Sequence, residues 1–226
     1  MSPRARRSAR RPIWTPARDK SVMRQTAVTV IVIGLLWAVL YYGYWVIVRR
    51  RLVVVAPRRV YQSGGMWPGW LLYYVRRYTI KTVIDFRAPH EEGVSRQARA
   101  LADAGIRYIN IPIGALPTQS DLRCFIDVMT EELSAGRCVL MHCKDGQGRA
   151  IAMAAIYRIE FEGWSPLQAY RGTTRLPPGF KFVSCVYPSA GLLSSRNCKT
   201  QFILEYRPVR GVLSTHTAQY VSVAGG

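Results

Sequence analysis

The chain has 226 residues and a formal net charge of +19, from 32 Lys and Arg against 13 Asp and Glu. Its length predicts one folded domain with an appendage. Most of the excess positive charge flanks a single apolar segment, so the composition argues against a nucleic-acid-binding protein.

The N-terminus is strongly basic. Residues 1–24 carry eight Lys and Arg and one Asp, among many Pro and Ser residues. Polar, charged segments of this kind bury too little apolar surface to fold alone. We therefore expect residues 1–25 to form a basic, disordered N-terminus.

An uncharged apolar segment follows at residues 26–48. A helix of this length spans roughly 34 Å, which is enough to cross a bilayer core of about 30 Å. Aromatic residues gather in its second half, as expected near a membrane interface. The basic run Arg49–Arg51 follows directly, where a cleaved signal peptide would need small residues. The segment is predicted to be an uncleaved transmembrane helix.

Basic residues lie on both sides of this helix. Residues 49–59 carry five Arg and no acid, and we expect them to form a basic linker. The N-terminal flank is more basic, which favours a cytoplasmic N-terminus and an exported domain. Arg49–Arg51 oppose that orientation. We expect a single-pass protein of a bacterial inner membrane, with the domain on the exported side.

From residue 60 onwards, strand and helix patterns alternate. Strands are expected at 81–86, 107–113 and 138–142, and helices at 95–104, 117–133 and 150–161. Strands separated by helices indicate a parallel sheet covered on both faces. Residues 60–175 are therefore predicted to form an α/β domain with a mainly parallel central sheet flanked by helices.

The C-terminal extension, residues 176–226, gives no functional signal. Residues 182–187 and 201–206 are apolar enough for extra strands or packing segments. Cys185 and Cys198 could form a disulfide if the domain is exported, and two buried free thiols are an equally good interpretation.

The strongest functional signal is the segment 139–150. A strand pattern ends at Cys143, a short loop leads to Arg149, and an apolar helix begins there. The predicted phosphate-binding loop consists of Lys144, Asp145, Gly146, Gln147, Gly148 and Arg149. Its glycines let backbone N–H groups turn inward, and the helix N-terminus attracts an anion. The planar guanidinium of Arg149 can bind two phosphate oxygens, while these positive groups favour the thiolate of Cys143 as a nucleophile.

The loop resembles the signature His-Cys-x5-Arg of the cysteine-based protein tyrosine and dual-specificity phosphatases. The similarity, in particular to the bacterial atypical members, extends over residues 60–64, 78–87 and 157–165. The resemblance implies that Cys143 attacks phosphorus, and that water hydrolyses the resulting phosphocysteine. It implies neither a cofactor nor a metal.

Two positions depart from this family. Ala150 follows the arginine where most members have Ser or Thr, and losing that hydroxyl costs about 1.5–3 kcal/mol in phosphoenzyme breakdown. Gly114 lies where the family usually has the Asp that acts as general acid. Asp121 is the first candidate for that acid, although an Asp also suits the first turn of a helix. Asp145 is the alternative.

The resemblance and its two departures leave three candidate functions. The first is a membrane-anchored phosphatase acting on phosphotyrosine or similar monoesters of a protein. The second acts on a phospholipid or inositol phosphate, because Lys144 and the Gln147–Arg149 ending resemble the loop of lipid phosphatases, which have a second lysine at the position of Gln147. The third is a catalytically silent phosphate-binding module, which Ala150 and the missing acid favour.

Overall fold

The computed structural model describes residues 16–172 and 198–209. The chain divides into two compact units, one ending at Tyr41 and the other beginning at Tyr42. The second unit holds the predicted α/β domain.

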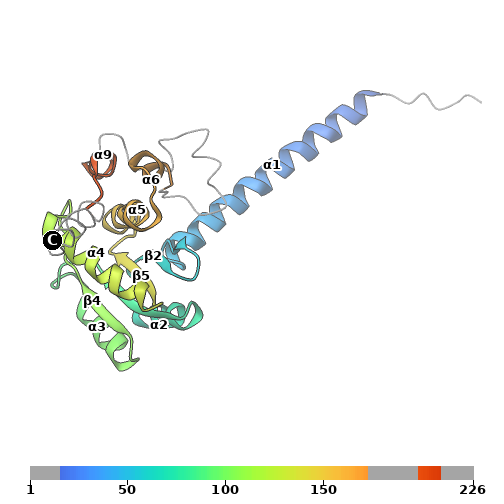
Figure 1. Ribbon diagram of the computed structural model, residues 1–226. Helices are drawn as coiled ribbons and strands as arrows, with labels where there is room; N and C mark the ends of the chain where they lie inside the picture. The colour runs from blue at the N-terminus through green and yellow to red at the C-terminus, as the bar shows by residue number, and fades with distance from the viewer. Residues whose placement is uncertain (1–15, 173–197, 210–226) are drawn as a thin grey trace, which may run out of the picture. The chain divides into compact units, whose positions relative to one another are not determined.

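Helix α1 (Pro16–Ile47) contains the apolar segment (Figure 1). Its part from Lys20 to Ile47 is, within the described chain, the one helix long and apolar enough to cross a membrane. The helix begins ten residues before the predicted span, within the segment 1–25 that was expected to be disordered. Pro16 suits the first turn of a helix, and a helix already formed in the apolar segment is extended at little cost.

The last turn of α1 is folded into the second unit. Trp45 is buried there, and its indole Nε1 donates a hydrogen bond to the Leu52 carbonyl at 3.3 Å. Strand β1 (Val53–Ala56) follows within the segment that was expected to be a linker. That expectation is wrong, because three consecutive valines favour a strand and β1 pairs antiparallel with β2 (Val60–Gly64).

The sheet has five strands in the order β1-β2-β5-β3-β4. Strand β5 (Cys138–Cys143) lies at its centre, between β2 and β3 (Ile80–Asp85), and β4 (Arg107–Asn110) lies at the edge. All pairs except β1–β2 are parallel, which confirms the predicted mainly parallel sheet.

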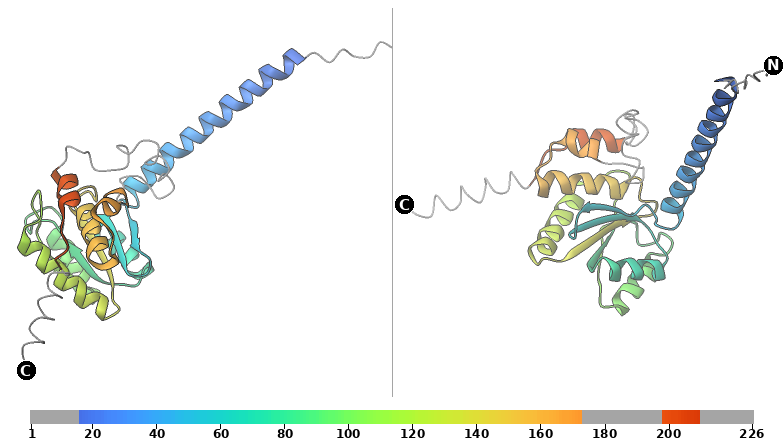
Figure 2. Two further views of the ribbon diagram at one scale, coloured as in Figure 1. Left: turned by 45° about the horizontal axis from the view of Figure 1, so that its top comes forward. Right: turned by 90° about the vertical axis from the view of Figure 1, so that its right-hand side faces the viewer.

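Helices cover both faces of the sheet (Figure 2). Leu71, Tyr74 and Leu101 of helices α2 (Pro68–Arg77) and α3 (Val94–Asp103) form one apolar core with the sheet. Helices α4 (Gln119–Ser134) and α5 (Arg149–Glu162) form a second core on the opposite face.

Two further helices pack against α5. They are α6 (Pro166–Gly172) and α9 (Cys198–Glu205). The segment 201–206, expected as a strand or packing segment, is therefore mostly helical, and its Ile203 is buried. Residues 182–187 and Cys185 lie outside the described residues, so the proposed pairing of Cys185 with Cys198 stays a prediction.

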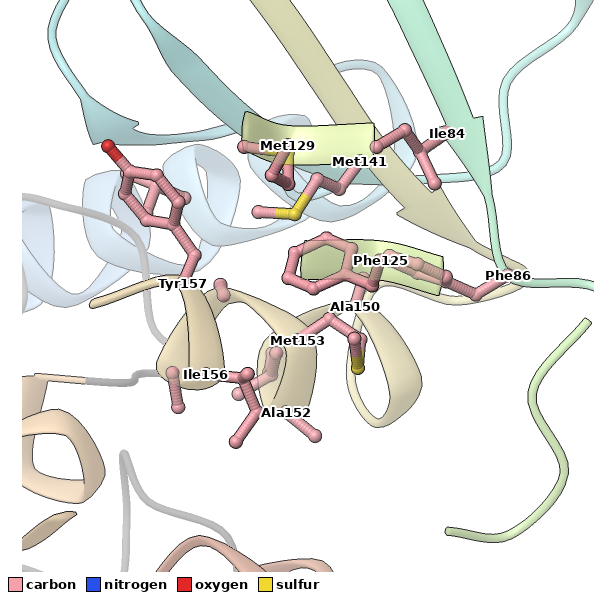
Figure 3. Close-up of a cluster of buried hydrophobic side chains, with 14 of the residues drawn as sticks. Ile84, Phe86, Phe125, Met129, Met141, Ala150, Ala152, Met153, Ile156 and Tyr157 are labelled. Carbon is pink, nitrogen blue, oxygen red and sulfur yellow. The ribbon is translucent and has the colours of Figure 1, made fainter. Parts of the chain in front are cut away.

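The core beneath the predicted loop is built around α5 (Figure 3). Ala150, Met153 and Tyr157 pack in the same apolar cluster as Phe125 and Met129 of α4. Every residue from Ala150 to Glu160 is buried, because α5 lies between the sheet on one side and α6 and α9 on the other. A helix enclosed in this way holds its first residue, Arg149, in a defined position.

Candidate functional site

The predicted loop lies at the carboxyl ends of the parallel strands. Cys143 is the last residue of β5 and is 3% exposed, and Arg149 is the first residue of α5. Gly64, the last residue of β2, is paired with Cys143 in the sheet register. Open parallel sheets bind ligands at this edge, so the fold places the predicted loop where a ligand can reach it.

Two glycines allow the loop to pack closely against β2. Gly146 has φ of +67°, and a Cβ atom there would lie 2.6 Å from the backbone nitrogen of Gly64. The Gly65 amide donates to the Lys144 carbonyl at 2.9 Å, and Gln62 Nε2 donates to the Gly146 carbonyl at 3.3 Å. These contacts fix the path of the loop backbone.

Two arginines that follow α1 contact the loop and the segment next to it. Arg51 Nη1 donates to the Asp145 carbonyl at 2.9 Å, and the Gln147 amide oxygen, turned towards the guanidinium, accepts from the same atom at 3.0 Å. Arg50 Nε donates to the Gly65 carbonyl at 2.8 Å. The basic residues that follow the apolar helix therefore form part of the site.

Arg149 is held by the carboxylate of Glu91, which no sequence motif indicates. Glu91 accepts from Arg149 Nη1 at 2.6 Å and from Nη2 at 3.0 Å. Nη1 also donates to the carbonyls of Phe86 and Ile113, at 3.0 and 3.3 Å. Hydrogen bonding from Arg149 lowers the pKa of Glu91 from 4.5 to about 2, so the pair is ionised at neutral pH.

A buried ion pair supports the neighbouring segment. The carboxylate of Asp85 accepts from the backbone N–H, Nε and Nη2 of Arg87, and from the Tyr108 hydroxyl at 3.0 Å. Burial alone would raise the pKa of Asp85, but the hydrogen bonds and the charge of Arg87 hold it below its usual range. Arg87 also donates to the Glu92 carbonyl, which steadies the segment that carries Glu91.

His142 is fully buried next to Cys143. Its Nε2 lies 3.7 Å from an Asp85 carboxylate oxygen, and its side chain is 1% exposed. Burial lowers the pKa of His142, which favours the neutral ring. This environment suits a residue that positions Cys143 better than one that exchanges protons with solvent.

The candidate general acids occupy different settings. Asp121 forms a capping box at the start of α4: its carboxylate accepts from the Thr118 N–H at 2.8 Å, and the Thr118 hydroxyl accepts from the Asp121 N–H. Asp145 is exposed on the loop itself. Ala150 is completely buried in the apolar core directly after Arg149.

The C-terminal part of the chain also reaches the loop. A Cβ atom at Gly148 would lie 3.3 Å from Cε of Lys199, in α9. A single sequence does not indicate that Lys199, about 50 residues after the loop, lies next to it. Among residues 16–172 and 198–209, no three His, Cys, Asp or Glu side chains are grouped to hold a metal ion.

Residues 64–175 match the family described as "DSP-PTPase phosphatase fused to NAD+ Kinase". The human "Phosphatidylglycerophosphatase and protein-tyrosine phosphatase 1" is 29% identical over 82 residues, which are 36% of this chain and 41% of that protein. The Rattus norvegicus protein of the same name is 30% identical over 71 residues, 31% of this chain and 37% of that protein. The chain thus matches about two fifths of the length of these curated relatives.

Solved structures share the fold. The crystal structure of PTPMT1 has a TM-score of 0.54 at 17% identity, covering 74% of this chain and 99% of that chain. The core catalytic domain of the PP-IP phosphatase SIW14 from S. cerevisiae has a TM-score of 0.52 at 16% identity, covering 74% and 92%. With the family match and the curated relatives added to this fold, the chain belongs to the cysteine-based dual-specificity phosphatases.

Proposed function

We propose that this chain is a membrane-anchored phosphatase that hydrolyses phosphate monoesters of the phosphotyrosine or dual-specificity type through a phosphocysteine. One observation carries the proposal. Cys143 and Arg149 lie at the two ends of a five-residue loop, between the central strand and the N-terminus of a buried helix.

The chemistry follows from these positions. The Cys143 thiolate attacks phosphorus, a P–S bond forms, and the P–O bond to the leaving group breaks. Water then attacks phosphorus, inorganic phosphate leaves, and the electron pair of the P–S bond returns to sulfur as the thiolate. Loop N–H groups and Arg149 hold the phosphate oxygens in both steps.

The leaving group needs a proton unless it is a weak base. In this proposal the donor is Asp121, with Asp145 as the alternative. Asp145 lies on the loop, whereas the Asp121 carboxylate already accepts a hydrogen bond at its helix cap. Asp121→Asn and Asp145→Asn separate the two, because loss of the true acid slows alkyl phosphates far more than p-nitrophenyl phosphate.

Hydrolysis of a phospholipid or inositol phosphate is the second candidate. The curated human relative carries both a phosphatidylglycerophosphatase and a protein-tyrosine phosphatase activity in its name. A membrane anchor suits either a lipid or a membrane-bound protein as substrate.

The anchor is proposed to be α1, with a cytoplasmic N-terminus and an exported domain. Its length and composition support a single span. A C-terminal alkaline phosphatase fusion is expected to be active, since that reporter works only after export. An inactive fusion of full length would place the domain on the cytoplasmic side.

The direct test is hydrolysis of p-nitrophenyl phosphate by the full chain in detergent micelles. Cys143→Ser is expected to abolish turnover, because an alcohol is a poor nucleophile without activation. Cys124→Ser is the matched control, since Cys124 is an exposed thiol on α4. Turnover that is absent from the unmodified protein would leave only the silent phosphate-binding module, and equal turnover in the two variants would contradict Cys143 as the nucleophile.

A further inference from the structure

A pocket of about 370 Å³ lies beside the catalytic loop. The second unit alone forms it, from the end of α1, the segment between β2 and α2, the start of α3 and the loop. Lys144 and Gly65 line it, whereas Cys143 and Arg149 do not. The pocket therefore lies beside Cys143 and Arg149 and shares only Lys144 with the phosphate-binding loop.

The charge of this pocket is positive. Its charged lining residues are Arg50, Arg87, Arg96, Lys144 and Glu92. The buried Asp85 neutralises Arg87, with 2.7 Å between the charged groups. Three cations then face one carboxylate, that of Glu92.

Two of these cations are accessible to a ligand. Lys144 is exposed, and among residues 16–172 and 198–209 no side chain pairs with its ammonium group. The Arg96 side chain is 59% exposed and lies 3.7 Å from a Glu92 oxygen. Its guanidinium lies 5.4 Å from the ring centre of Trp67, which keeps it at the pocket edge.

The rim of the pocket is apolar. Ile47 is 72% exposed and Trp67 is 70% exposed, and both line the pocket. Ile47 is the last residue of α1, so the pocket opens where the apolar helix ends. An anion with an apolar neighbouring group fits this combination of cations and exposed apolar surface.

We propose that this pocket binds a second phosphate group of the substrate while the loop binds the phosphate to be removed. This inference rests on the proposed function and narrows its substrate class to phosphomonoesters that carry another phosphate. Lys144 can contact both phosphate groups, because it belongs to the catalytic loop and also lines the pocket. The second phosphate can be the diester of a lipid headgroup or that of a soluble compound.

The test compares three substrates. p-Nitrophenyl phosphate has a single phosphate group. Glycerophosphoinositol 5-phosphate has a phosphomonoester and a phosphodiester. Dioctanoyl phosphatidylinositol 5-phosphate has both of these groups and two acyl chains. Arg96→Gln removes a pocket cation, and Arg99→Gln is the matched control because Arg99 is exposed on the same helix and does not line the pocket.

Arg96→Gln is expected to raise KM about five- to tenfold for both diester-bearing substrates, the loss typical of one hydrogen bond made at an exposed position. Its kcat, and all constants for p-nitrophenyl phosphate, should not change. If Arg96→Gln raises KM more for the dioctanoyl compound than for the soluble diester, the pocket binds the phosphate of a lipid headgroup. If it raises both KM values equally, the pocket recognises the phosphate alone. Equal changes in Arg96→Gln and Arg99→Gln, or no KM effect on either diester substrate, would overturn the second site.

Binding to Cys143→Ser separates this inference from the proposed function, since it requires no turnover. The diester substrates should bind at least fivefold more tightly than p-nitrophenyl phosphate, and Arg96→Gln should remove that difference. Failure of the wild-type protein to hydrolyse any substrate would contradict the proposed function alone. Equal affinity for all three compounds would contradict the second site alone.

Discussion

Glu91 binds the guanidinium of Arg149 through two hydrogen bonds, of 2.6 and 3.0 Å, although 58 residues separate them in the chain. The arginine is thus oriented before any phosphate arrives. Because Glu91 uses Nη1 and Nη2, it sets which edge of the guanidinium faces the loop.

Glu91→Gln is expected to lower kcat/KM for p-nitrophenyl phosphate by roughly tenfold, since one charge-assisted partner of Arg149 is lost. Glu92→Gln is the control, because the adjacent Glu92 side chain is 88% exposed. Steady-state kinetics on both variants check this. Equal activity in the two variants would show that Glu91 does not position Arg149.

The same pair predicts a pH dependence of stability. Folding lowers the pKa of Glu91 from 4.5 to about 2, so the ionised carboxylate stabilises the folded chain above pH 4.5. This contribution is lost as the pH falls towards 2. The difference in Tm between wild type and Glu91→Gln should be constant from pH 7 to pH 5 and shrink below pH 4.5, as measured by circular dichroism. A difference that grows with acidity would contradict the pairing.

Gly146→Ala is expected to abolish activity. The position has φ of +67°, and the new Cβ would lie 2.6 Å from Gly64 N, so backbone must shift. Strain of about 1–3 kcal/mol would lower Tm by several degrees. Gly114→Ala is the control, because nothing lies within 4 Å of its added Cβ. Kinetics and thermal unfolding of the two variants should differ sharply, and similar behaviour would refute the close packing.

Arg51→Gln is expected to loosen the loop. The substitution removes the guanidinium that donates to the Asp145 carbonyl and to Gln147. KM for p-nitrophenyl phosphate, and the Ki of inorganic phosphate, should rise about threefold to tenfold, the loss typical of one net hydrogen bond. Arg77→Gln, on the exposed end of α2, should leave both constants unchanged.

Ala150→Ser tests the departure from the family motif. A hydroxyl at this buried position can donate to the departing sulfur and is expected to speed phosphoenzyme breakdown by tenfold or more. Rapid-quench kinetics should show a smaller burst and a higher steady-state rate in the variant. An unchanged steady-state rate would show that breakdown does not limit turnover.

The sequence was sufficient for the parts of the site that lie in one continuous segment. Cys143 and Arg149 were predicted because a strand, a glycine-containing loop and a helix follow each other without interruption. The parallel sheet was predicted because its strands alternate with helices of clear periodicity, and the structure confirms it.

Other parts of the site depend on contacts between distant segments. Glu91 lies in a loop without periodicity, and Arg51 reaches Asp145 across 94 residues. In the sequence, Arg50 and Arg51 belong to a basic run after the apolar segment, which is typical of a linker next to a membrane. Their contacts with Gly65 and Asp145 depend on the pairing of β1 with β2, which places residues 50 and 51 beside the loop. The α9 helix was missed because eight residues of mixed apolar pattern do not distinguish a strand from a helix.

A phosphoryl group on Cys143 is the intermediate on which the proposed reaction depends. We would mix the full chain with phosphate-labelled p-nitrophenyl phosphate, quench the reaction in acid within milliseconds, and map the label by mass spectrometry. We expect label on Cys143 that disappears in Cys143→Ser and accumulates less in Ala150→Ser. Turnover without any label on Cys143, or label that persists in Cys143→Ser, would contradict it.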